Sequence, residues 1–155
     1  MAIVGVISDT HGLLRPEAMA ALHGSELILH AGDIGRAEIL ERLRAVAPVV
    51  PVRGNVDRGL WAENLPDTEV VKFAGRYLYL LHDRNALSLD PAAAGFAAVI
   101  CGHSHRPAME RRRGVLYFNP GSAGPRRFNL PISVGRLHLT NGDIRGEIVD
   151  LSKLA

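Results

Sequence analysis

Short apolar runs alternate with amphipathic stretches in the first third of the chain. The apolar, partly β-branched runs predict buried strands over residues 3–8, 27–30 and 49–53. Helices are predicted over 16–23, which begins with a proline and is followed by a glycine, and over 38–46, where apolar side chains recur at helical spacing. Strand–helix–strand units of this size give parallel strands joined by right-handed crossovers.

Pairs of apolar runs joined by glycine-containing turns dominate the rest of the chain. The segment Asn141-Gly142-Asp143, between runs 133–140 and 144–151, is a strong hairpin signal. Two more hairpins are predicted, one from runs 70–73 and 77–82 and one from runs 109–112 and 115–118. Between them, a helix is predicted over 92–96 and a strand over 98–101. The pattern predicts an α/β chain whose two packed sheets carry helices on the outside.

Length and composition narrow the class of protein. The chain has 155 residues, 47% of them hydrophobic, and we expect residues 1–155 to form a single domain with its own core. One cysteine, Cys101, leaves no internal disulfide. No basic segment precedes the first apolar run, and no run approaches membrane-spanning length. We therefore expect a soluble, cytoplasmic protein without a membrane partner.

The formal net charge is +2, and part of the positive charge lies in two arginine clusters, 111–113 and 126–127. Such clusters can attract anionic substrates. For residues 111–113 we favour a simpler interpretation, in which the arginines are solvated turn or edge-strand residues.

Polar side chains of ligand type follow five of the predicted strands, at the point where each strand ends. They are Asp9, His11, Asp33, Asn55, His82, His103 and His105. Because ligands of open α/β sheets bind beyond the carboxyl ends of the strands, we expect these seven side chains to meet at one site. Carboxylates, an amide and imidazoles without a thiolate suit Mn²⁺, Fe²⁺, Co²⁺ or Zn²⁺, and they argue against a structural zinc site.

Seven ligands are too many for one ion and suit two ions about 3.5–4 Å apart that share a carboxylate. Asp33 is the natural bridge, because its strand should lie centrally between the others. Asp9 and His11 are two residues apart, so an extended segment would point both at one ion. The same holds for His103 and His105 in an extended segment, whereas a local kink would send them to neighbouring ions.

Several residues beside these ligands call for a structural interpretation. Gly32, Gly54 and Gly102 each precede a ligand and would allow close backbone approach at the site. His30 would either support the metal site or be a satisfied core histidine, and we favour the second. Cys101 should behave as a small buried hydrophobe.

The ordered motifs resemble a known family. The set Asp9-x-His11, Gly32-Asp33, Gly54-Asn55, His82 and Gly102-His103-Ser104-His105 resembles the calcineurin-like metallophosphoesterase superfamily. The Asn-Pro-Gly-Ser segment 119–122 and the Gly-Asn-x-Asp form of 54–57 resemble its small YfcE-type phosphodiesterase branch. The resemblance covers residues 3–127. It implies a four-layer α-β-β-α sandwich of two mixed sheets flanked by helices, with a binuclear metal site.

The resemblance also implies a role for each ligand. One ion would take Asp9, His11, Asp33 and His105, and the other Asp33, Asn55, His82 and His103. Both would be divalent, with Mn²⁺ expected first and Zn²⁺, Fe²⁺, Co²⁺ or Ni²⁺ as alternatives. Asp33, Asn55 and His103 are the expected catalytic residues.

The expected reaction is hydrolysis of a small phosphate ester, a diester rather than a monoester, by a metal-bridging hydroxide that attacks phosphorus in line. Asn55 and Arg127 are expected to contact the phosphate, with an uninvolved surface arginine as the alternative for Arg127.

Two positions depart from the family pattern. Val56 stands where the wider superfamily often has a proton-donating histidine and the small branch often has cysteine, and Asp83 stands where glycine is usual. General acid catalysis contributes about 10²–10⁴-fold, so its loss at Val56 should favour activated or diester substrates.

Two other functions compete with this one. A eukaryotic relative of the small branch serves as a retromer subunit, so the chain is alternatively a scaffold, although it keeps every ligand position. A nuclease is the other alternative, but aromatic residues are only 5% of the chain and nucleic acid is the less expected substrate. Members of the family often form dimers or higher assemblies, so the resemblance leaves a homo-oligomer open for this chain.

Overall fold

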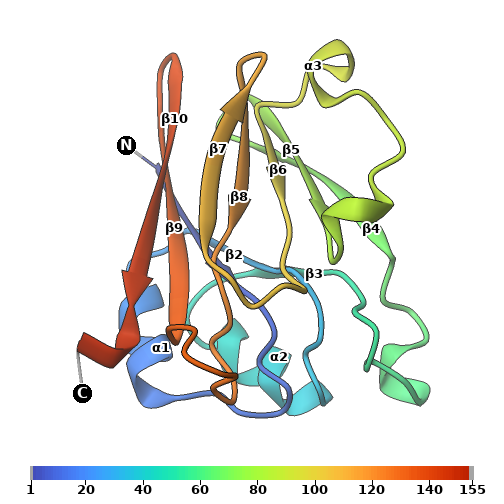
Figure 1. Cartoon of the computed structure of the whole chain (residues 1–155), viewed down its shortest axis with the longest axis vertical. Coiled ribbons are helices and arrows are strands. Elements are labelled where there is room, and N and C mark those ends of the chain that lie inside the picture. The colour runs from blue at the N-terminus through green and yellow to red at the C-terminus, as the bar shows by residue number, and fades with distance from the viewer. Residues whose placement is uncertain (1, 154–155) are drawn as a thin grey trace.

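The fold, in the computed structural model, places the ten strands of the described residues, 2–153, in two mixed sheets of five strands each (Figure 1). The first sheet has the order β10-β9-β1-β2-β3. Its strands are β1 (Ala2–Ile7), β2 (Leu27–His30), β3 (Val49–Pro51), β9 (Ser133–Thr140) and β10 (Asp143–Asp150). β1, β2 and β3 are parallel, whereas β9 pairs antiparallel with both β1 and β10.

The second sheet has the order β4-β5-β6-β8-β7. Its strands are β4 (Thr68–Phe73), β5 (Arg76–Leu81), β6 (Ala98–Ile100), β7 (Ala108–Arg112) and β8 (Val115–Asn119). The central strands β5, β6 and β8 are parallel, and β4 and β7 pair antiparallel at the two edges. The arginines of segment 111–113 therefore lie on an edge strand and its turn, as expected, where charged side chains discourage pairing with another sheet.

Three apolar clusters separate four layers. The central cluster lies between the two sheets and contains the fully buried Phe118 with Val6, Leu29 and Leu80. A second cluster joins the outer face of the first sheet to α1 (Pro16–Leu22) and α2 (Ala37–Arg44). A third covers the outer face of the second sheet with the segment around the short helix α3 (Pro91–Ala94). This arrangement confirms the expected α-β-β-α sandwich, whose fourth layer is thin.

The predicted elements are present, with shifts at their ends that have local causes. All three hairpins use two-residue loops, so Arg76 and Asp143, predicted in turns, begin strands β5 and β10. The helix predicted over 92–96 begins at Pro91, where the Asp90 carboxylate accepts from Ala93 N (3.3 Å). It ends before Gly95, whose φ of 84° is left-handed.

Short 3₁₀ turns complete the described elements: Leu60–Ala62, Arg84–Ala86 and Leu151–Lys153. Among residues 2–153, no helix is long and apolar enough to cross a membrane. The single domain expected over 1–155 includes residues 1, 154 and 155, which lie outside the described residues.

Candidate metal centre

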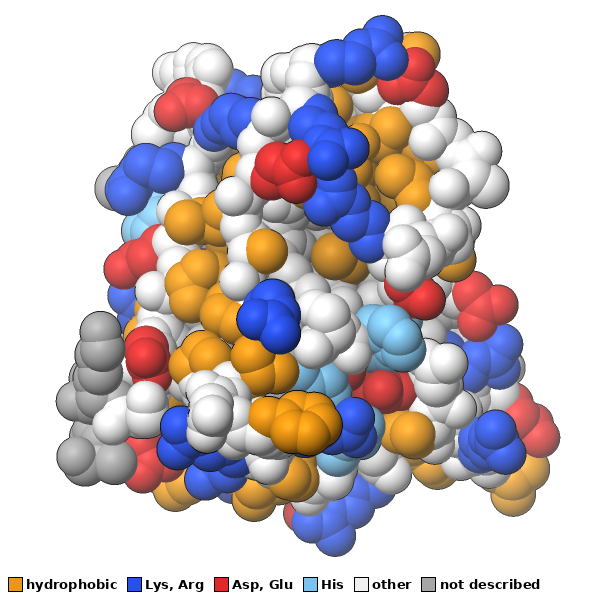
Figure 2. Space-filling model, viewed as in Figure 1, with side chains coloured by type: hydrophobic (Ala, Val, Ile, Leu, Met, Phe, Trp, Pro, Cys, Tyr) orange, Lys and Arg blue, Asp and Glu red, His pale blue; other side chains and the backbone are white. Residues whose placement is uncertain are grey.

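The candidate ligands lie where the carboxyl ends of the parallel strands from both sheets face one another. Asp9 and His11 follow β1, and Asp33 follows β2. From the second sheet, His82 follows β5, and the loop after β6 carries His103 and His105. Figure 2 shows histidine side chains beside acidic ones on this face of the molecule, with basic side chains next to them.

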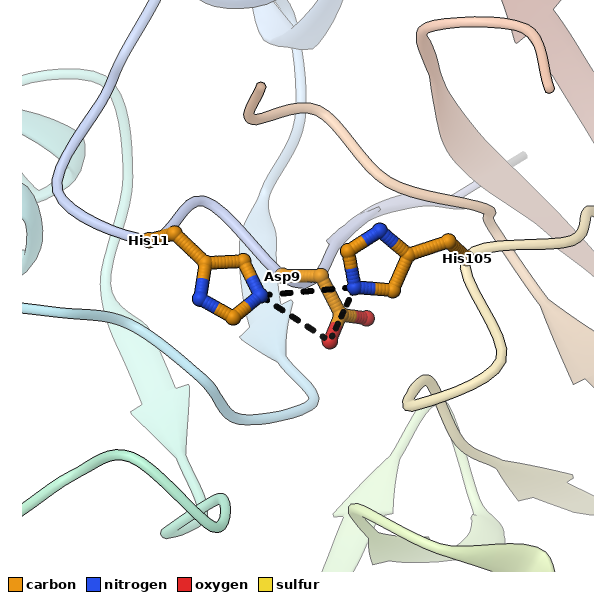
Figure 3. Close-up of side chains that lie close together, drawn as sticks. All are labelled: Asp9, His11 and His105. Carbon is orange, nitrogen blue, oxygen red and sulfur yellow. Dashed lines mark hydrogen bonds and ion pairs between the residues drawn. The ribbon is translucent and has the colours of Figure 1, made fainter. Parts of the chain in front are cut away.

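The first group consists of Asp9, His11 and His105, whose ligand atoms all lie within 4.8 Å of one another. Figure 3 shows the two imidazoles converging on the carboxylate from opposite sides. The Nε2 atoms of the histidines are 3.3 Å apart, and Asp9 Oδ1 is 3.4 Å from His105 Nε2 and 3.9 Å from His11 Nε2. Asp9 is fully buried and His105 nearly so, which leaves His11 as the partly open member.

The second group consists of Asp33, His82 and His103, again within 4.8 Å. Asp33 Oδ2 is 3.2 Å from His82 Nε2, and His103 Nδ1 is 3.3 Å from the same nitrogen. His82 Nδ1 donates to the Ala31 carbonyl (2.7 Å), so its Nε2 is aimed at the group. Asp33 and His82 are buried, whereas the His103 side chain is 43% exposed.

The two carboxylates share one design, in which one oxygen is held by the protein and the other faces the imidazoles. Asp9 Oδ2 accepts from Ser8 Oγ (2.7 Å) and His103 N (3.0 Å), and Asp33 Oδ1 accepts from Val56 N (3.0 Å). The second oxygen of Asp33, Oδ2, lies 3.7 Å from His11 Nε2 as well as 3.2 Å from His82 Nε2. Asp33 therefore lies between the two groups.

The charges of the second group support each other. Burial alone would raise the pKa of Asp33, but hydrogen bonds from His82 and Val56 N hold that pKa well below its usual value. Burial would lower the pKa of His82, but the hydrogen bonds to Asp33 and the Ala31 carbonyl raise it. A carboxylate that stays ionised is a ready ligand for a cation.

The first group has the opposite balance. Burial, together with the charges of His105 and Arg127, lowers the pKa of His11 despite the opposing carboxylates Asp33 and Asp9. A neutral imidazole is the form that binds a metal.

The residues present fit divalent cations. Among the described residues, Asp9 Oδ1 is buried and accepts no hydrogen bond, although three imidazole nitrogens surround it at 3.4–4.0 Å. An ionised oxygen left in this way is costly unless a cation or proton compensates it. In both groups two imidazole nitrogens also face each other, about 3.3 Å apart.

Asp9 and His11 lie in one group, but the extended backbone that was expected to bring them together is not present. Asp9 has a φ of 55° and His11 a φ of 46°. His103 (72°) and His105 (62°) are left-handed too, and this kink sends them to different groups. Asp33 has a φ of 55°. Such backbone is unfavourable for residues other than glycine and concentrates at functional sites.

The glycines before the ligands allow close approach, as expected. A Cβ on Gly54 would overlap the backbone nitrogen of Asp33, and one on Gly102 would overlap Ser8 Oγ. A side chain at either position would push the ligand-bearing loops apart.

His30 is a satisfied core histidine that also supports the site. Thr10 Oγ1 donates to Ile34 O (2.8 Å), so it accepts from His30 Nε2 (3.0 Å), while Gly32 N donates to His30 Nδ1 (3.1 Å). This arrangement requires a neutral ring, and complete burial lowers the pKa of His30 to about 4. His30 thereby fixes the residue between Asp9 and His11 and the residue before Asp33.

Two supporting residues lacked an assigned role in the sequence. Asp57, only 3% exposed, accepts from the amides of Ile34 (3.2 Å), Gly35 (3.0 Å) and Gly54 (2.8 Å). It ties the loop after β2 to the loop after β3. The only signal for it was the Gly-Asn-x-Asp spacing of segment 54–57.

The second is Asn119, which opens the Asn-Pro-Gly-Ser segment. Its amide donates to Gly102 O (2.9 Å) and Ser104 Oγ (3.1 Å), and Ser122 Oγ donates to Asp9 O (3.0 Å). The segment therefore braces both halves of the centre.

Asn55 and Arg127 lie at the edge of the centre. Both are exposed. Asn55 lines a cavity that His82 also lines, and Arg127 is close enough for its charge to lower the pKa of His11.

Comparison with known proteins gives one family. The model of the calcineurin-like phosphoesterase superfamily domain matches residues 1–142. A probable metallophosphoesterase of Methanothermobacter thermautotrophicus is 34% identical over 159 aligned residues, which cover 95% of this chain and 91% of that protein.

Solved structures agree on the fold. The phosphoesterase YfcE of E. coli has a TM-score of 0.73 at 24% identity, covering 99% of this chain and 95% of its own. Wild-type Vps29 of Entamoeba histolytica, solved in complex with Zn²⁺, has a TM-score of 0.72 at 26% identity, covering 96% of this chain and 99% of its own.

Proposed function

The chain belongs to the calcineurin-like phosphoesterase superfamily, as its motifs predicted, and from this premise we propose that it is a two-metal phosphodiesterase. The observation that carries the proposal is the pairing of two carboxylate–imidazole groups around Asp33, whose Oδ2 faces nitrogens of both groups. Two divalent ions that share a carboxylate are the arrangement used to hydrolyse phosphate esters.

We propose the ligand sets that the resemblance implied. Asp9, His11, Asp33 and His105 would hold one ion, and Asp33, Asn55, His82 and His103 the other. Carboxylate, amide and imidazole ligands suit Mn²⁺ first, with Zn²⁺, Fe²⁺, Co²⁺ and Ni²⁺ as alternatives.

When bound, two such cations supply Lewis acidity, which makes a water nucleophilic near neutral pH and neutralises charge on the phosphoryl oxygens. The protein's own residues hold this chemistry in place. His82, fixed by the Ala31 carbonyl, presents Nε2 in a constant direction. Asn55 and Arg127, exposed at the edge of the centre, would orient the phosphate of the substrate.

Leaving-group chemistry follows from Val56. Its side chain is 48% exposed beside Asn55 and has no proton to give. A general acid typically contributes about 10²–10⁴-fold, so the enzyme should act best on diesters or activated esters whose alcohol leaves without protonation.

The test is hydrolysis of bis-p-nitrophenyl phosphate by chelator-treated protein, with and without added Mn²⁺. We expect turnover only with metal. Asp33→Ala should abolish it and weaken metal binding, because it removes the shared ligand, whereas Asp143→Ala, a change at an exposed carboxylate of β10, should leave it intact. Full activity of Asp33→Ala would contradict the proposal.

The neighbour Vps29 favours one other function, a protein-binding scaffold on the same fold. A scaffold predicts metal binding, measured by calorimetry, with no metal-restored hydrolysis of any phosphate ester. Nuclease activity remains the third alternative, and a steep salt dependence of cleavage of nucleic acid would mark it.

A further inference from the structure

A cavity of about 250 Å³ opens beside the second candidate group. It is lined by Asn55 and His82 of the proposed metal site and by three charged residues, Arg53, Asp67 and Asp83. Leu81 and Ala86 add apolar surface. The cavity is therefore placed to receive a group attached to a phosphate at the metal centre.

The charges around the cavity are unbalanced. Arg53 donates to Asp67 Oδ1 through both Nε (3.2 Å) and Nη2 (3.0 Å), so these two charges compensate each other. Asp83 Oδ1 accepts only a backbone amide, that of Asn85 (3.0 Å), and Oδ2 is 3.8 Å from His103 Nε2. No lysine or arginine among residues 2–153 pairs with Asp83, whose side chain is 36% exposed.

We propose that this cavity binds the organic substituent of the phosphate ester and that Asp83 makes it prefer a substituent carrying an ammonium group. The inference rests on the proposed function, which places the phosphate beside Asn55 and His82. An alkylammonium group would meet the carboxylate of Asp83, which no lysine or arginine among residues 2–153 pairs with, while its carbons contact Ala86. An anionic substituent would meet repulsion from the same carboxylate.

The first experiment compares two diesters that release the same p-nitrophenolate. They are p-nitrophenyl phosphocholine, with a cationic arm, and ethyl p-nitrophenyl phosphate, with a neutral one. We expect a higher kcat/KM for the cationic arm with Mn²⁺-loaded protein. Asp83→Asn should lower the ratio of the two by roughly two- to fivefold, the worth of one partly exposed ion pair. Glu41→Gln, an exposed change on α2, should leave the ratio unchanged.

A second measurement separates this inference from the proposed function. Calorimetry would compare phosphocholine with ethyl phosphate on the Mn²⁺-loaded protein and on Asp83→Asn, after the Mn²⁺ affinity of both has been shown to match. Tighter binding of phosphocholine that depends on Asp83 supports the cavity even if neither diester is hydrolysed, a result that would count against the proposed function alone. Equal binding of the two ligands, or a preference that survives Asp83→Asn, overturns the inference even with normal hydrolysis.

Discussion

Replacement of Asp57 by alanine should be among the most damaging single changes in this protein. The carboxylate accepts three backbone amides, from Ile34, Gly35 and Gly54, and is 3% exposed. A buried donor left without its acceptor costs about 1–3 kcal/mol, and these three share one site, so their costs do not add fully. We expect Asp57→Ala to lower the free energy of unfolding by roughly 3–6 kcal/mol, a large share of the usual 5–15 kcal/mol.

The assay is urea unfolding monitored by circular dichroism. The protein is metal-free, so bound ions contribute nothing to the measured stability. Asp57→Asn keeps one acceptor oxygen and should lie between wild type and Asp57→Ala. Asp143→Ala, which loses an exposed carboxylate, should stay within about 0.5 kcal/mol of wild type. A loss below about 1 kcal/mol for Asp57→Ala would refute the argument that these three hydrogen bonds hold the two loops together.

Three further predictions concern titration, the thiol and metal linkage. The pKa of His30 is lowered to about 4, so its contribution to stability is complete above pH 6.5 and is lost as pH falls through 4, by up to about 3 kcal/mol. The raised pKa of His82 changes stability with pH in the opposite sense, so the effect of His30 has to be isolated by comparison with a variant. The measurement is the difference in free energy of unfolding between wild type and His30→Gln, by urea at pH 7 and at pH 4.5, and a difference that does not change with pH would contradict the prediction. Burial raises the pKa of Cys101 to about 11, so Ellman's reagent should modify it at pH 8 only after unfolding, and reaction of the folded protein would show an open thiol. Saturating Mn²⁺ should raise the Tm of wild type more than that of Asp33→Ala in a thermal melt, and equal shifts would place the ion elsewhere.

Element type could be predicted because it depends on local pattern, and so could the meeting of six candidate ligands, all but Asn55, at one edge of the sheets. Apolar runs between turn residues marked strands, and polar residues after five of them marked one edge. The direction of each ligand could not be predicted in this way. His103 and His105 point to different groups because both have left-handed φ, a conformation that strand alternation does not encode.

Supporting residues were harder still, because their roles depend on contacts between distant segments. Asp57 reaches amides 22 and 23 residues earlier in the chain, and Asn119 reaches back 17 residues to Gly102. Nothing in the residues beside them distinguishes a buried brace from a surface turn. The charge balance of the cavity likewise could not be predicted, because it depends on Arg53 pairing with Asp67 and not with Asp83.

The division of ligands between the two sheets has a consequence for stability. Loops of the first sheet supply both carboxylates and His11, whereas loops of the second supply His82, His103 and His105. Each candidate group therefore combines side chains from the two sheets. Because the site forms only when the sheets pack, ions bound there would join the sheets and stabilise the folded state by an amount that grows with the logarithm of their concentration relative to Kd. A cation bound at Asp9 Oδ1, which accepts no hydrogen bond, would therefore add to the contact between the sheets that Phe118 and its neighbours already form.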